Sequence, residues 1–150
     1  MGREATNTLY AGTFERSMDA KKRVAVPASW LSLEEGEEFH VVPPPEKGYL
    51  MVMPHAEFER WEQRIMESDM PAPKKRVAIR HFYASSHLVT ADKQGRILLP
   101  ETHCEQAGLT GEIVFIGSKS RFEIWSKERF QHAQADEEAI YREVAEAIGL

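Results

Sequence analysis

The sequence of 150 residues contains a single cysteine, Cys104, so it can form no internal disulfide. It also lacks long apolar runs: its longest are about five residues, whereas a membrane span needs roughly 20. Residues 1–6 lack the apolar segment of a secretory signal. With 42% hydrophobic and 29% charged residues, the chain can still bury a core. We therefore expect a folded cytoplasmic protein with no membrane association.

A net positive charge is lacking as well, since the formal charge is −5, whereas DNA-binding proteins usually present a basic face. The acidic residues are concentrated, however, with six against three basic residues in 126–150 and four more in 34–38. The basic residues gather in three clusters: Lys21 to Arg23, Lys74 to Arg76, and Lys93 with Arg96. The distribution therefore leaves room for local positive patches.

The patterns of catalytic and metal-binding proteins are missing too. The sequence has no P-loop, no Rossmann glycine pattern and no hydrolase nucleophile elbow. Its six histidines do not combine with several cysteines at the short spacings of a structural zinc site. We interpret Cys104 as a small packing residue rather than a nucleophile. We therefore expect no enzymatic activity, no metal, no cofactor and no small-molecule substrate.

What the sequence does have is an internal repeat. Residues 19–27 align with residues 92–100 at a constant offset of 73, with Asp, Arg and Pro in matching positions. Further landmarks follow in the same order in both copies: residues 36–41 with 111–116, residues 50–53 with 122–125, and Phe58 with Phe130. Because this order is hard to obtain by chance, we infer that one unit has been duplicated.

Each copy predicts the same series of elements. A strand enters a charged turn, a second strand stops at a proline, a short helical turn follows, and two further strands have β-branched and aromatic content. These segments are residues 9–14, 24–26, 28–33, 39–42 and 50–53 in the first copy and 87–90, 97–99, 101–107, 113–116 and 122–125 in the second.

Helices are predicted to close both copies, over residues 55–68 and 127–135. Asp136 is a good N-cap, so a separate helix is expected from there, with a narrow apolar stripe that must dock on this chain or a neighbour. Between the copies, residues 70–76 have the composition of a linker, and residues 81–83 suggest one further strand.

The repeated turn is the most informative feature. In residues 92–96, Gly95 can supply the positive φ of a tight hairpin, and Asp92 can cap the turn through the backbone. Lys93 and Arg96 then project from a rigid loop, and arginine suits bidentate contact with phosphate or guanine. The alternative is an Asp–Arg pair that only stabilises the hairpin, although an exposed pair contributes just about 0–1 kcal/mol.

The second copy resembles the second repeat of the MraZ family. The resemblance rests on D-K-Q-G-R-I-L-L-P, A-G-L, V-F-I-G and R-F-E-I-W, which are residues 92–100, 107–109, 114–117 and 121–125. The first copy is similar to the family's first repeat more loosely, through Phe14, residues 18–23 and Pro27.

The resemblance implies an α+β fold, a pseudo-duplicated double-split β-barrel of the SpoVT-AbrB kind with flanking helices. The implied divisions are a first SpoVT-AbrB-like repeat at 7–70, a linker at 71–80, a second repeat at 81–135 and a C-terminal helix at 136–150.

The resemblance also implies a function. By this resemblance, we expect a ring-shaped homo-oligomer that binds short direct repeats in promoter DNA. It would regulate transcription of a division and cell-wall gene cluster, which implies a cytoplasmic, nucleoid-associated protein. The family's two D-x-x-x-R loops are implicated in DNA binding, and here these are Asp19 with Arg23 and Asp92 with Arg96. On charge and position alone, Lys21, Lys22 and Lys93 are expected to contact phosphates.

The first loop departs from the family pattern, because Lys22 stands where a glycine is usual. Lysine has a steric cost at positive φ, so we expect this turn to differ from the second or to be strained. Residues 43–45 are three prolines, which predict an extended loop between strands. Together with the acidic charge, these departures support an alternative: a protein-interaction or oligomerisation module of the same fold that has lost DNA binding.

Overall fold

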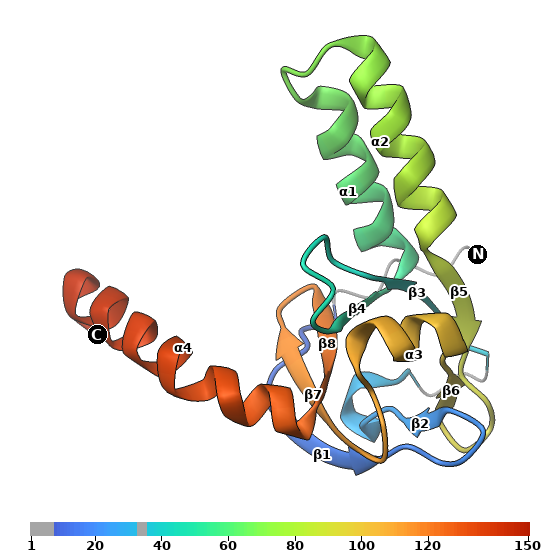
Figure 1. Ribbon diagram of the computed structural model, residues 1–150, viewed down its shortest axis with the longest axis vertical. Helices are drawn as coiled ribbons and strands as arrows, with labels where there is room; N and C mark the ends of the chain where they lie inside the picture. Colours follow the sequence, from blue (N-terminus) through green and yellow to red (C-terminus); the bar gives the residue numbers. More distant parts are fainter. Residues whose placement is uncertain (1–7, 33–35) are drawn as a thin grey trace.

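The chain folds as a mixed α+β protein built on antiparallel strands (Figure 1). This computed structural model describes residues 8–32 and 36–150. Three sequence-based interpretations therefore lie wholly or partly outside the described residues: the absence of a signal segment in residues 1–6, the last residue of the helical turn predicted at 28–33, and the first two carboxylates of the acidic stretch at 34–38.

Six strands form one antiparallel sheet in the order β1-β7-β8-β4-β3-β5. They are β1 (Thr13–Ser17), β3 (Glu38–Val42), β4 (Leu50–Met53), β5 (His87–Thr90), β7 (Glu112–Ser118) and β8 (Arg121–Ser126). The order interleaves the two halves of the sequence, since β1 pairs with β7 and β3 pairs with β5. Strands from both halves therefore share one sheet.

The two remaining strands, β2 (Arg23–Ala25) and β6 (Arg96–Leu98), pair with each other in a separate antiparallel ladder, here called the β2–β6 ribbon. Val24 lies opposite Ile97, and both side chains are buried in the core. Within residues 8–32 and 36–150, the pairings do not close either sheet into a barrel.

Each strand of the ribbon ends at a proline and is followed by a short helix. These are the 3₁₀ turn η1 (Ala28–Trp30), after Pro27, and α3 (Glu101–Ala107), after Pro100. Trp30 packs against Phe122 and Phe115 in the core, and α3 buries Cys104. Burial raises the pKa of the Cys104 thiol and so disfavours the reactive thiolate.

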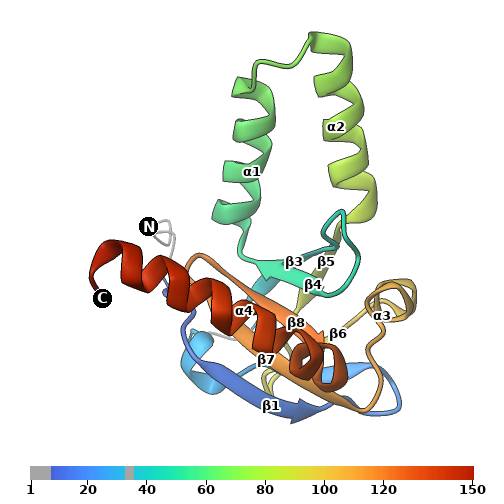
Figure 2. The ribbon, with the colours of Figure 1, turned by 60° about the vertical axis from the view of Figure 1, so that its left-hand side comes forward.

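Helices α1 (His55–Glu67) and α2 (Ala72–Ser85) form an antiparallel hairpin that projects from the sheet (Figures 1 and 2). The prediction of a strand at 81–83 was wrong, because α2 includes all three residues, and most of the segment at 70–76 with linker composition is also helical. Pro71 and Pro73 are tolerated because they fall at the helix start, where N–H groups have no intrahelical partner. Phe82 stacks on Phe58 of α1, with ring centroids 4.5 Å apart, so helix packing decides its conformation.

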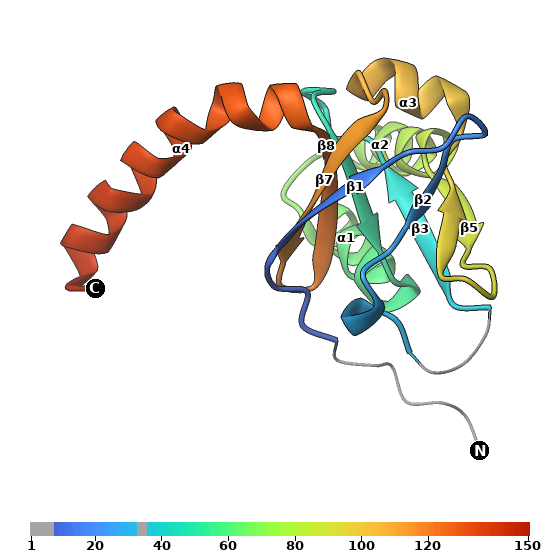
Figure 3. The same ribbon diagram turned by 90° about the horizontal axis from the view of Figure 1, so that it is seen from below.

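Helix α4 (Lys127–Ile148) is continuous, so the predicted second start at Asp136 was wrong. Ser126 caps the helix, its Oγ accepting the Arg129 N–H at 3.1 Å, and Gly149 ends it in the left-handed conformation. With no glycine or proline in between, nothing interrupts the helix at Asp136. The distal part of α4 extends away from the sheet (Figure 3). None of the helices in the described ranges is both long and apolar enough to cross a membrane.

The other predicted elements lie close to their observed positions, except the first strand. It was predicted at 9–14 but runs from Thr13 to Ser17, and Tyr10 makes only an isolated bridge to Lys119. Gly12 separates the two pairings, because its φ of 99° takes the backbone out of the extended conformation.

We predict that Gly117→Ala destabilises the protein. A Cβ atom at Gly117 would lie 2.5 Å from the backbone of Tyr10 and Ala11, which cannot move without breaking the bridge to Lys119. The free energy of unfolding in urea should fall by about 1–3 kcal/mol. Gly48→Ala is the control, because its Cβ would make only an ordinary contact at 3.6 Å. Equal stability of the two variants would contradict this account of β7.

Candidate nucleic-acid interface

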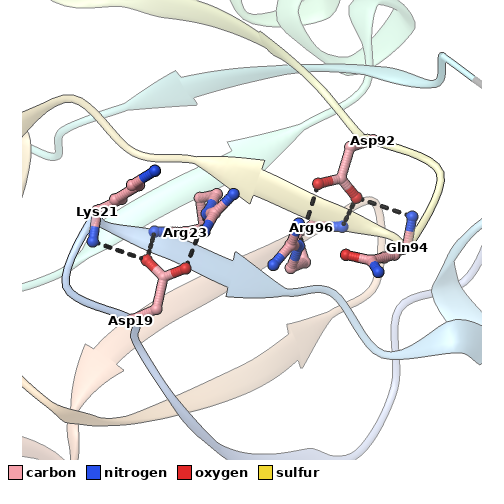
Figure 4. Close-up of polar contacts among 6 residues, drawn as sticks. All are labelled: Asp19, Lys21, Arg23, Asp92, Gln94 and Arg96. Atoms are coloured by element: carbon pink, nitrogen blue, oxygen red, sulfur yellow. Dashed lines mark hydrogen bonds and ion pairs between the residues drawn. The ribbon is translucent and has the colours of Figure 1, made fainter.

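The loop before β2 is closed by the carboxylate of Asp19 (Figure 4). Its Oδ1 accepts the backbone N–H groups of Lys21 at 2.9 Å and Arg23 at 2.8 Å, and its Oδ2 accepts Nε–H of Arg23 at 2.8 Å. One side chain therefore both fixes the backbone of the turn and orients the guanidinium group.

The loop before β6 repeats this arrangement. Oδ1 of Asp92 accepts the N–H groups of Gln94 and Arg96, both at 2.9 Å, and Oδ2 accepts Nε–H of Arg96 at 3.1 Å (Figure 4). Because the ribbon is antiparallel, the two loops approach it from opposite ends. The duplicated motif thus becomes a pair of matching loops with two arginines between them.

Lys22 adopts the same left-handed conformation as Gly95, with φ values of 67° and 77°. The sequence predicted that the first turn either differs from the second or is strained. Because the two turns have the same conformation, the first turn is strained. The backbone carbonyls of the two residues also make equivalent hydrogen bonds across the ribbon. The Lys22 carbonyl accepts the Leu99 N–H at 2.9 Å, and the Gly95 carbonyl accepts the Val26 N–H at 3.0 Å. The lysine has not changed the geometry of the loop.

Both arginine side chains leave the ribbon on its outer face. Val24 and Ile97 point into the core, so their neighbours along each strand point the opposite way. The side chains of Arg23 and Arg96 are 33% and 32% exposed, so neither is sealed inside the protein. Only Nε of each guanidinium bonds to the loop carboxylate, and within the described residues the terminal nitrogens make no hydrogen bond.

The two loop carboxylates are held in their ionised form. The backbone N–H of Arg23 is the main cause that lowers the pKa of Asp19, and that of Arg96 lowers the pKa of Asp92 in the same way. Since a lowered folded-state pKa stabilises a structure at pH values above it, the loops keep these bonds at neutral pH and lose them only in acid.

The local charge of both loops is positive despite these carboxylates. In residues 19–23 three basic side chains outnumber one acidic side chain, and in residues 92–96 two outnumber one. The lysines are not equivalent, because Lys93 aligns with Ala20, whereas Lys21 aligns with Gln94. The cationic charge is therefore unevenly shared between the two ends of the ribbon.

All seven residues predicted from the sequence lie in these two loops or at the first position of the strand that follows each: Asp19, Lys21, Lys22, Arg23, Asp92, Lys93 and Arg96. Sequence reasoning missed Ala25 and Leu98, which share the outer face with the arginines because they lie two positions further along each strand. The alternation of side chains in a strand was the signal that could have found them. Among the described residues, no cluster of His, Cys, Asp or Glu could hold a metal ion.

Comparison with known proteins places the chain in a family. The family model described as "MraZ protein, putative antitoxin-like" matches residues 82–148. A protein of Carboxydothermus hydrogenoformans, named transcriptional regulator MraZ, is 36% identical over 143 residues, which cover 93% of this chain and 96% of the relative. This chain belongs to the MraZ family.

Other MraZ relatives match over a similar extent. The transcriptional regulator MraZ of Desulforamulus reducens is 35% identical, covering 93% of this chain and 97% of its own length. That of Symbiobacterium thermophilum is also 35% identical, covering 93% of this chain and 99% of its own. The MraZ family model includes the second loop and β6, which is the half of the chain where the sequence resemblance was most specific.

We predict that Lys22→Gly stabilises the protein. A lysine in the left-handed region destabilises the folded state by about 1–2 kcal/mol, and glycine removes this steric cost. Glycine also loses more conformational entropy on folding than lysine does, so the net gain in stability is smaller. The free energy of unfolding should therefore rise by roughly 0.5–1 kcal/mol. Lys21→Gly removes the same charge at a residue without positive φ, and it should not stabilise. A Lys22→Gly variant no more stable than wild type would show that the turn is unstrained.

Proposed function

We propose that this chain is a transcriptional regulator that binds double-stranded DNA with the outer face of the β2–β6 ribbon. The observation that carries the proposal is the position of Arg23 and Arg96, which lie diagonally across the ribbon on one exposed face and are each held by a loop carboxylate. A two-stranded ribbon fits the major groove of B-DNA, where arginine is the usual partner of guanine O6 and N7.

The free guanidinium nitrogens favour binding over a purely structural Asp–Arg pair. Each carboxylate engages Nε and leaves the terminal nitrogens available for a bidentate contact. Holding the side chain in place beforehand lowers the entropy cost of binding. The intact geometry at Lys22 also favours the DNA-binding interpretation over an interaction module with a defective first loop.

The lysines of the loops supply contacts of a second kind. Lys21 and Lys22 directly precede β2 and Lys93 lies in the loop before β6, so they flank the ribbon at its two ends, where they would meet phosphates on either side of the groove. Such contacts add affinity for DNA that does not depend on base sequence, and this affinity falls as the salt concentration rises. A chain of net charge −5 can bind DNA in this way because its positive charge is local.

We also propose a cellular role for this surface on the basis of the family. The relatives are named transcriptional regulators, and we assign the same role here, in the cytoplasm and at the nucleoid, on short direct repeats upstream of a division and cell-wall gene cluster. We further propose a double-split β-barrel of two SpoVT-AbrB-like repeats, residues 7–70 and 81–135. The interleaved strand pairing supports it. The proposal includes no enzymatic activity.

A homo-oligomeric ring is part of the proposal, because two projecting elements leave apolar side chains uncovered. On α4, the exposed apolar residues are Ile140, Tyr141, Val144 and Ile148. On the α1–α2 hairpin, a hollow is lined by Met66 and Ile79 with the stems of Lys75, Arg76 and Arg80. Since the distal half of α4 is acidic and this hollow is basic, we assign α4 of one copy to the hairpin of the next.

We predict that Arg96→Ala sharply weakens DNA binding. Loss of one bidentate base contact should lower the affinity for promoter DNA by about 5- to 150-fold at fixed salt, measured by fluorescence anisotropy. Arg64→Ala on α1 removes the same charge away from the ribbon and should bind like wild type. If Arg96→Ala bound promoter DNA with wild-type affinity, the ribbon would not be the DNA-binding surface, and the interaction module would be favoured.

We predict that Val144→Glu breaks the oligomer. A carboxylate in the apolar stripe of α4 cannot be buried against a second copy without a large desolvation cost. Light scattering after gel filtration should show a smaller assembly. Ala139→Glu makes an equal charge change on the opposite side of the helix and should leave the assembly size unchanged. Unchanged size in both variants would exclude this face of α4 from the interface.

A further inference from the structure

The β2–β6 ribbon is close to two-fold symmetric about the Val24–Ile97 pair. The loop carboxylates, the arginines and the flanking carbonyl hydrogen bonds all have a counterpart at the other end. A fully symmetric ribbon would present the same side chains to both halves of its site and would therefore favour a palindrome. A direct repeat requires each ribbon to lie on the DNA in one direction.

The loop lysines already differ between the two ends, and on the strands themselves the outer face breaks the symmetry at one pair of equivalent positions. Ala25 and Leu98 are equivalent at the offset of 73, yet one is the smallest chiral residue and the other is a leucine that is 57% exposed. The register places Leu98 directly opposite Arg23, and Ala25 directly opposite Arg96. One arginine thus has a large apolar neighbour and the other does not.

The chemistry of the groove suggests what Leu98 meets. Among the base edges of the major groove, the C5-methyl of thymine is the apolar group, and it pairs with apolar side chains. Directly opposite residues in an antiparallel ladder have Cβ atoms about 4.5–5.5 Å apart, which is between one and two times the rise of about 3.4 Å between neighbouring base pairs. A guanine contact by Arg23 would therefore bring Leu98 over an adjacent base.

We propose that Leu98 is a specificity-determining residue that contacts a thymine methyl beside the guanine read by Arg23. The inference rests on the proposed binding of DNA by the ribbon. Ala25 is too short to make the equivalent contact beside Arg96, so the two halves of the site differ. That difference gives each ribbon a direction, which lets successive copies of a ring read successive copies of a direct repeat.

The test replaces thymines one at a time by deoxyuridine in a duplex selected for tight binding by wild-type protein. Deoxyuridine pairs as thymine does but lacks the methyl group. One position per repeat should lower wild-type affinity about fourfold, the effect of one buried methyl-sized group. Leu98→Ala should bind the thymine duplex correspondingly less well and should no longer distinguish the two bases at that position.

Two further variants sharpen the result. Leu9→Ala removes a leucine that is 70% exposed outside the ribbon, and it should keep the wild-type response to deoxyuridine. Ala25→Leu makes the outer face symmetric and should create a second methyl-sensitive position beside the guanine read by Arg96. Circular dichroism would verify that each variant is folded, as expected for exposed positions.

The outcomes separate this inference from the function on which it rests. Failure of wild-type protein to bind any duplex at low salt would overturn both. Tight binding by wild type with an equal deoxyuridine response in Leu98→Ala, or with no methyl-sensitive position, would overturn the role of Leu98 and leave DNA binding standing.

Discussion

The hydrogen bonds of the loop carboxylates are the interaction on which the rest of the site depends. Asp19 and Asp92 each hold two backbone N–H groups and one arginine Nε. The first two bonds fix a turn with a left-handed residue, and the third orients the guanidinium group. Without the carboxylate, neither the entry into the strand nor the direction of the arginine would be determined.

The position of these loops relative to each other comes from packing over long distances in the sequence. Val24 and Ile97 anchor the ribbon because both are buried in the core formed by the larger sheet. The larger sheet in turn interleaves strands from the two halves of the chain. Duplication therefore does more than supply two loops, because pairing between the copies brings two arginines onto a single surface.

Sequence reasoning predicted the local features of the site better than its surroundings. The turn at Gly95 and the arginine at its end were predictable because glycine, aspartate and the following strand act over a few residues. The unchanged turn at Lys22 was not, since the local steric cost argued against it and the Asp19 hydrogen bonds override that cost. The alternation along β6 could have placed Leu98 on the same face as Arg96, but its position opposite Arg23 depends on a non-local register.

The errors in the helices have the same origin. Residues 70–76 have the prolines and charges of a linker, yet the two prolines fall at the start of α2 and Phe82 of the same helix packs on Phe58. Asp136 looks like an N-cap only if the chain before it is not already helical, and Ser126 has started that helix ten residues earlier. Composition and capping preferences could not decide either case without the packing.

Hydrogen–deuterium exchange of the full-length protein, with and without duplex DNA, tests the central assignment most directly. The account predicts that DNA slows amide exchange in residues 19–26 and 92–99 together, because the two loops and both strands of the ribbon form one contact surface. Protection confined to α4 or to the α1–α2 hairpin, with the ribbon unchanged, would contradict it.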